Sequence, residues 1–298
     1  MTEPAKVLLH MCNGPENVTL VREALTGLSE YGQFAGAELN DIRTAVTEAC
    51  NNVVVHAYEG GEGPLEVEIG LMPGTTEVVV RDEGGGIQPR IRALEEGPLG
   101  IGLAVIQALV RSVEFRDSGG GGTEVRMRFD TQAADSAGAD GAGADGARAD
   151  REGDHSARRP AAPLERWGIS SRELSRTIGI TIAPARAGRG ILPRVLSVLA
   201  ARANFSTDRI CDVQLLADAL TARAPQSPAG DLISLAVTVG RRTLQLTLGP
   251  LAAGNARVLV EQSEVEGLGS VIEKLSDEQR VSSDSGAEHL VLRMLDRH

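Results

Sequence analysis

Two polar residues share one face of a predicted helix and could do chemistry together. Glu48 and Asn52 are four residues apart in the segment 38–58, and His56 continues the same face. An Asn side-chain oxygen is a suitable ligand for Mg²⁺, and a Glu one turn away could polarise an attacking hydroxyl or water as a general base. The E-x-x-x-N spacing is common, so a solvated polar stripe ended by a packing histidine is the alternative.

An acidic residue followed by glycines is the second candidate. Asp82 ends the apolar segment 76–81, and Gly84 and Gly86 follow it. A carboxylate can accept a hydrogen bond from the exocyclic amine of adenine, whereas guanine presents a carbonyl at that position. Glycines beyond it would let the backbone pass close to a base, where a side chain would collide. The alternative is a tight turn that needs glycine.

A second pair of glycines opens an apolar helix. Gly100 and Gly102 begin the segment "GIGLAVIQAL", and the first N–H groups of such a helix form a ready site for phosphate. An ordinary loop-to-helix junction is the alternative. The preceding segment, 87–99, carries two arginines, two glutamates and two prolines. It is either a short lid over a nucleotide or a surface loop.

Strands and helices must position these residues. Segments 64–71 and 123–129 alternate apolar and polar residues, which predicts a sheet with one face in water. Segment 76–81 supplies the strand before Asp82, and Leu39, Ile42, Ala45, Val46 and Ala49 form the apolar face of helix 38–58. Helices then cover only one face of the sheet. The fold class is therefore α/β, a two-layer sandwich and not a doubly wound sheet.

The chain divides at a compositionally biased segment. Residues 131–163 repeat Ala, Gly and Asp and have few large apolar side chains, so they cannot offset the entropy of ordering. They are predicted to be a flexible linker between a first unit, 1–130, and a second unit, 164–298.

The second unit repeats the order of the first. A strand at 176–184, two helices within 191–224 and strands at 231–239, 242–249 and 288–295 follow the linker. An offset of 171 residues places Ile42 on Val213 and Ala49 on Leu220. An internal duplication is the interpretation, with chance similarity between two α/β units as the alternative.

Charge and cysteine content narrow the class of protein. The net charge is −11; residues 1–130 contribute −10 and residues 164–298 contribute +1. The absence of a strongly basic region argues against a protein that binds nucleic acid through phosphate contacts. The acidic first unit is suited to a basic protein partner, or its charge serves only solubility.

The three cysteines fit neither a metal cluster nor a disulfide framework. No segment reaches the roughly 18 apolar residues of a membrane helix, so we expect a cytoplasmic protein away from the membrane.

Taken in order, these motifs resemble one family. Segments 45–58 "AVTEACNNVVVHAY", 80–87 "VRDEGGGI", 97–106 "GPLGIGLAVI" and 121–129 "GGTEVRMRF" resemble the N box, the two glycine boxes and the closing strand of the GHKL ATPase superfamily. The first unit is most similar to the bacterial anti-sigma-factor serine kinases of the RsbW and SpoIIAB type.

The resemblance implies a cofactor, a reaction and partners. It implies ATP with Mg²⁺ bound through Asn52, Glu48 as the catalytic base, and Asp82 as the residue that recognises adenine. It also implies serine/threonine protein kinase activity, with a sigma factor and an antagonist protein as partners in transcription regulation. The other residues implied to bind the cofactor are Gly84, Gly86, Ile87, Gly100, Ile101, Gly102, Leu103 and Thr123.

The sequence departs from the family in two places. The segment between Ile87 and Gly100 is shorter than in well-known members and lacks their Thr-rich stretch, so an ATP-binding regulatory module without significant kinase turnover is the alternative function. At the offset of 171, Glu48 falls on Ala219 and Asn52 on Arg223. The second unit is therefore predicted to be a degenerate copy that binds no ATP and pairs with the first unit inside the same chain.

Overall fold

The computed structural model describes residues 3–85, 100–117, 121–131, 174–222, 230–265, 269–284 and 286–297. The described part of the first unit contains β1 (Ala5–Cys12), η1 (Pro15–Asn17), α1 (Val18–Gly32), α2 (Gly36–His56), β2 (Pro64–Met72), β3 (Thr75–Asp82), α4 (Gly100–Leu109), β4 (Ser112–Asp117) and β5 (Thr123–Asp130).

From β6 onward, the second unit begins with the same succession of elements, a strand, a short 3-10 helix, two helices and two strands. Its described elements are η4 (Leu174–Arg176), β6 (Thr177–Ala183), η5 (Ala185–Ala187), α5 (Gly188–Arg202), α6 (Thr207–Ala222), β7 (Ile233–Gly240), β8 (Thr243–Leu251), α7 (Asn255–Gln262), β9 (Glu264–Val265), β10 (Gly269–Ser270), α8 (Val271–Leu275), β11 (Glu278–Asp284) and β12 (Ala287–Leu295). The sequence analysis did not predict α7 or the small β9–β10 hairpin.

The two units share one antiparallel sheet. Its strand order is β11-β12-β8-β7-β6-β1-β2-β3-β5-β4, so the units are arranged symmetrically about the β1–β6 pair. Leu9 lies opposite Ile180 there, and the two residues are 171 positions apart, as are the first residues of α2 and α6. This repeated order is what a duplication predicts; the common origin of the units stays a prediction.

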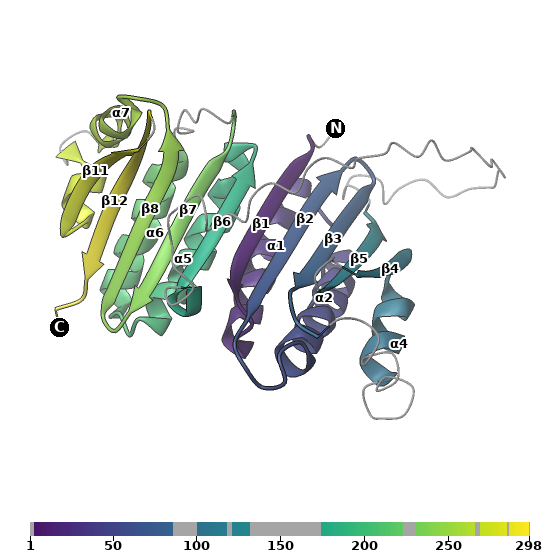
Figure 1. Cartoon of the computed structure of the whole chain (residues 1–298). Helices are drawn as coiled ribbons and strands as arrows, with labels where there is room; N and C mark the ends of the chain where they lie inside the picture. Colours follow the sequence, from purple (N-terminus) through teal and green to yellow (C-terminus); the bar gives the residue numbers. More distant parts are fainter. Residues whose placement is uncertain are drawn as a thin grey trace.

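Within the described residues, the helices that pack on this sheet cover one of its faces, which confirms the two-layer α/β sandwich (Figure 1). The alternating residues predicted to face the core are buried in both strands: Leu65, Val67, Ile69 and Leu71 in β2, and Val125, Met127 and Phe129 in β5. The apolar face of α2 is buried from Ile42 to Val53, with Leu39 partly buried.

The helix α4 is apolar in sequence but lies mostly outside the core. Of its side chains that the structure describes, only Ile106 is buried. The physical reason is position: α4 lies at the outer edge of the first unit, where it packs mainly on α2 (Figure 1).

The helices α1 and α5 bring the units together behind the β1–β6 pair. A Cβ on Gly27 of α1 would lie 2.4 Å from the carbonyl oxygen of Gly190 of α5, so the two backbones touch. Arg194 forms an ion pair with Glu30 across the contact. Glycine at both positions allows this close packing.

The end of the first unit includes Thr131, the first residue of the predicted linker. Its N–H donates to the Gly74 carbonyl at 3.1 Å, and its hydroxyl lies 3.3 Å from that of Thr76. The remainder of the predicted linker lies outside the described residues. Among the helices that the structure describes, none has the length and hydropathy needed to cross a membrane.

Candidate functional site

The helices α2 and α4 bring Glu48, Asn52 and Gly102 together. A Cβ on Gly102 would lie 3.0 Å from Glu48 Oε2 and 3.9 Å from Asn52 Oδ1. Both side chains of α2 therefore face the first turn of α4, and both are half-buried. Any side chain at position 102 would enter the space in front of the carboxylate, so glycine leaves that space open.

Asp82 lies at the end of β3 with its carboxylate held in place. Only 2 % of the residue is exposed. Its Oδ1 accepts the N–H of Gly84 at 2.9 Å and that of Thr123, brought by the neighbouring strand β5, at 3.3 Å. Two backbone donors on one oxygen fix the orientation of the carboxylate at the edge of the sheet.

The turn after Asp82 packs against the end of α2. A Cβ on Gly84 would lie 2.0 Å from the carbonyl oxygen of Ala57, and the N–H of Gly85 donates to that oxygen at 3.0 Å. The close approach that requires glycine at position 84 is thus to the protein backbone. The turn that follows Asp82 is thereby tied to the helix that carries Glu48 and Asn52.

Tyr58 supports the same turn, and the sequence analysis missed it. Its hydroxyl donates to the carbonyl of Pro64 at 2.5 Å and accepts the N–H of Glu83 at 2.9 Å. Its ring covers Gly63, where a Cβ would lie 2.1 Å from a ring carbon. The chain has only two tyrosines, and this one follows a helix end, which is the only signal that could have drawn attention to it.

The remaining predicted cofactor residues fall in three groups. Gly86 and Ile87 lie outside the described residues, together with the rest of segment 87–99, for which a lid and a surface loop were the alternatives. Gly100 and Ile101 begin α4, and Leu103 in the same turn is half-buried. Thr123 is buried beside Asp82.

The equivalent place in the second unit has different chemistry. Counted from the starts of β3 and β8, Asp82 corresponds to Pro250, and Ala219 occupies the position of Glu48. A Cβ on Gly249 would lie 2.6 Å from the His289 ring, so that side chain fills the space beside the strand end. Arg223, the predicted counterpart of Asn52, lies outside the described residues.

The open face of the sheet carries a charge cluster behind the site. Arg81 donates to Glu66 at 2.7 Å and Glu68 at 3.0 Å through Nη1, and to Glu124 at 2.8 Å through Nε. Burial raises the pKa of Glu124, but hydrogen bonding to Arg81 and its positive charge outweigh burial, so the pKa lies below its usual value. The cluster ties β2, β3 and β5 together one residue before Asp82.

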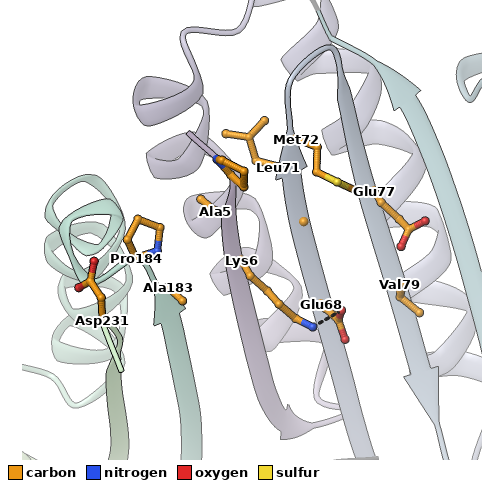
Figure 2. Close-up of a pocket in the computed structure, with 12 residues that line it drawn as sticks. Ala5, Lys6, Glu68, Leu71, Met72, Glu77, Val79, Ala183, Pro184 and Asp231 are labelled. Atoms are coloured by element: carbon orange, nitrogen blue, oxygen red, sulfur yellow. Dashed lines mark ion pairs between the residues drawn. The ribbon is translucent and has the colours of Figure 1, made fainter. Parts of the chain in front are cut away.

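A shallow groove of about 450 Å³ lies elsewhere on this open face (Figure 2). It spans the junction of the units between Lys6, Glu77 and Asp231. Lys6 Nζ lies 2.6 Å from Glu68 Oε1 within it. Its carboxylates outnumber its one cation, so it is unsuited to phosphate, and it lies on the face away from α2 and α4.

The first unit has the fold of a histidine kinase-like ATPase domain: the model of that domain matches residues 12–129. Serine-protein kinase RsbW from Bacillus pumilus (strain SAFR-032) is 30 % identical over 36 % of this chain and 75 % of its own length. The anti-sigma F factor of Thermoanaerobacter sp. (strain X514) is 35 % identical over 40 % of this chain and 89 % of its own. The chain belongs to this family of RsbW serine-protein kinases and anti-sigma F factors.

Among solved structures, the RsbU and RsbW domains of a Mycobacterium tuberculosis protein are similar to this chain. The likeness covers 42 % of this chain and 32 % of the other, at 24 % identity and a TM-score of 0.31. At that score it carries no argument about function.

Proposed function

We propose that this chain is an ATP-binding regulator of the anti-sigma-factor type, whose first unit phosphorylates a serine or threonine of an antagonist protein. The observation that carries the proposal is the arrangement of Glu48 and Asn52 around Gly102, on the helix whose end supports the Asp82 turn. Family membership makes protein partners of this kind, an antagonist and a sigma factor, the natural candidates. The proposed location is the cytoplasm.

The residues present fit ATP with Mg²⁺. Asn52 Oδ1 would hold the ion, whose charge offsets that of the phosphates, and the first turn of α4 offers backbone N–H groups to the phosphates. Asp82, oriented by two N–H donors, would accept a hydrogen bond from the adenine amine. Glu48 would take the proton of the attacking hydroxyl.

Calorimetric titration of ATP with Mg²⁺ tests the binding part. Wild type is expected to bind one ATP per chain, because the second unit has Pro250 and Ala219 in place of an acidic strand end and a base. Asp82→Asn should weaken binding, because its amide places an N–H₂ donor where the adenine amine needs an acceptor. Asp130→Asn, an exposed strand-end carboxylate paired with Arg111, is the matched control. Two sites per chain, or equal affinity in both variants, would contradict this assignment.

Phosphotransfer to a cognate antagonist tests the catalytic part. Glu48→Gln should keep ATP binding and lose transfer, because the amide cannot accept the proton. The second candidate is an ATP-binding regulatory module without significant turnover, and the short segment between Ile87 and Gly100 favours it. ATP binding with no transfer by wild type, in the presence of partner, would select that module. Full transfer by Glu48→Gln would show that another residue is the base.

We propose further that the second unit is a degenerate copy and the internal partner of the first. Supporting observations are the continuous sheet through β1 and β6 and the packing of α1 on α5. A protease site placed within 132–163 should yield two fragments that remain associated, and the intact chain should be a monomer by light scattering. Fragments that separate at micromolar concentration, or a homodimer of intact chains, would refute the internal pairing.

A further inference from the structure

We infer that Arg202 of the second unit is a positioning residue for the nucleotide site of the first unit, which it reaches through the buried side chains of Asn17 and Asn13 and the half-buried side chain of Tyr58. The inference rests on the proposed ATP site and goes beyond it, because it gives the degenerate unit a defined influence on that site. This network has three links between described residues: the first two are hydrogen bonds, and the third combines the packing of a ring on a glycine with a hydrogen bond.

The first link crosses the contact between the units. Arg202 is the last residue of α5, and its Nη1 donates to Asn17 Oδ1 at 2.7 Å, while Nη2 donates to the Glu16 carbonyl. Asn17 is buried, and its Nδ2 donates to the carbonyl of Cys12 at 2.8 Å. Because Arg202 can only donate, it fixes the oxygen of this amide toward α5 and the nitrogen toward the end of β1.

The second link runs from the end of β1 to the loop after α2. Asn13, next to Cys12, is also buried. Its N–H donates to the Gly63 carbonyl at 2.9 Å, its Oδ1 accepts the Gly63 N–H at 3.0 Å, and its Nδ2 donates to the Gly61 carbonyl at 3.2 Å. One side chain therefore pins the loop at two residues.

The third link joins the loop to the Asp82 turn. The ring of Tyr58 lies on Gly63, so its position depends on where Asn13 holds that glycine. Its hydroxyl accepts the N–H of Glu83, the residue between Asp82 and Gly84. A contiguous network that ends on the backbone beside the proposed adenine-binding carboxylate is a physical route for coupling between the units.

Another arginine of α5 provides the comparison. Arg194 crosses the same contact, but it pairs with the exposed side chain of Glu30, near the opposite end of α1 from Asn17. Removing Arg194 deletes an interfacial charge without touching the network. Removing Arg202 leaves the buried Asn17 Oδ1 without its hydrogen-bond donor, so the first link of the network is broken.

The experiment measures ATP affinity and amide hydrogen exchange in the full chain, for Arg202→Met, Tyr58→Phe, the double variant and Arg194→Met. We expect the ATP Kd to rise about fivefold to tenfold in each of the first two, within the usual range of coupling between sites. The double variant should be little weaker than either single variant, because both break one network. The Glu83 amide should exchange faster in Arg202→Met than in wild type or Arg194→Met, and Arg202→Lys should partly restore protection.

The outcomes separate the two proposals. If wild type binds ATP and Arg202→Met binds it equally well with unchanged Glu83 exchange, this inference is wrong and the proposed function stands. If the increases in ATP Kd from Arg202→Met and Tyr58→Phe multiply in the double variant, the two residues act independently. In that case, or if Arg194→Met weakens ATP binding equally, Arg202 is an ordinary interface contact. If wild type binds no ATP, the proposed function fails, and the role of Arg202 at a nucleotide site fails with it.

Discussion

Replacing Gly102 by Ala should separate stability from catalysis in this protein. The added methyl would lie 3.0 Å from Glu48 Oε2, closer than carbon and oxygen normally approach, so the carboxylate must move by a few tenths of an ångström. Among the described residues, the only other atom within 4 Å of this methyl is Asn52 Oδ1, which lies 3.9 Å away. The backbone of α4 can accept alanine, so the perturbation falls on the proposed base.

The substitution has two opposing effects, one on stability and one on the rate of phosphotransfer. Alanine in place of glycine within a helix raises the free energy of unfolding by about 0.5–1 kcal/mol. A displacement of about 1 Å in a catalytic group can slow a reaction by about 10²-fold, so a shift of a few tenths should slow phosphotransfer by roughly fivefold. The expected variant is therefore slightly more stable and less active.

Denaturant unfolding and a phosphotransfer assay with a cognate antagonist measure the two quantities. Gly36→Ala is the matched control: Gly36 is the first residue of α2, and a Cβ there would meet no described atom within 4 Å. Gly36→Ala should also raise the free energy of unfolding, and it should leave the rate of phosphotransfer unchanged. A Gly102→Ala variant with full transfer would refute the placement of Glu48 as the base opposite this glycine.

Three further outcomes are expected. Gly84→Ala should lower the free energy of unfolding by about 1–3 kcal/mol in a denaturant titration, because its Cβ would overlap a backbone oxygen; unchanged stability would contradict the close approach. Burial raises the pKa of Cys50 to about 12, so iodoacetamide at pH 8 should modify exposed Cys211 and spare Cys50, as read by mass spectrometry of the native protein. The pKa of Glu124 is lowered in the folded protein, so ionised Glu124 stabilises the fold. This stabilisation is complete above the ordinary pKa of 4.5 and is lost as the pH falls through the folded-state pKa. Arg81→Met should reduce this acid dependence in unfolding measured against pH, and an unchanged profile would count against the pair.

Local patterns in the sequence predicted the elements that carry the site. The residues predicted to face the core are buried in all three elements: the alternating apolar residues of β2 and β5, and the apolar face of α2 from Ile42 to Ala49. These predictions succeed because each rests on neighbours a few positions apart, where the periods of strand and helix decide which side chains share a face. The order of the motifs also indicated the family, which the comparisons confirm.

The support of the Asp82 turn was not visible in the sequence. Tyr58 reaches Glu83 across 25 positions, and Gly84 meets Ala57 across 27. Neither contact belongs to a repeating pattern, because both depend on how α2 lies against the end of β3. The same holds for α4: its composition is that of a buried helix, but its place at the edge leaves most of its described side chains partly exposed.

The sequence by itself determined the helices and strands that carry the site, the class of fold and the candidate residues Glu48, Asn52 and Asp82, because periodicity and short motifs are local properties. Only the tertiary structure decided that β1 pairs with β6, that Gly102 faces Glu48, and that Arg202 donates to Asn17 across 185 positions. Such contacts form when surfaces far apart along the chain are buried together. No local pattern specifies which distant backbone or polar group a given residue will contact.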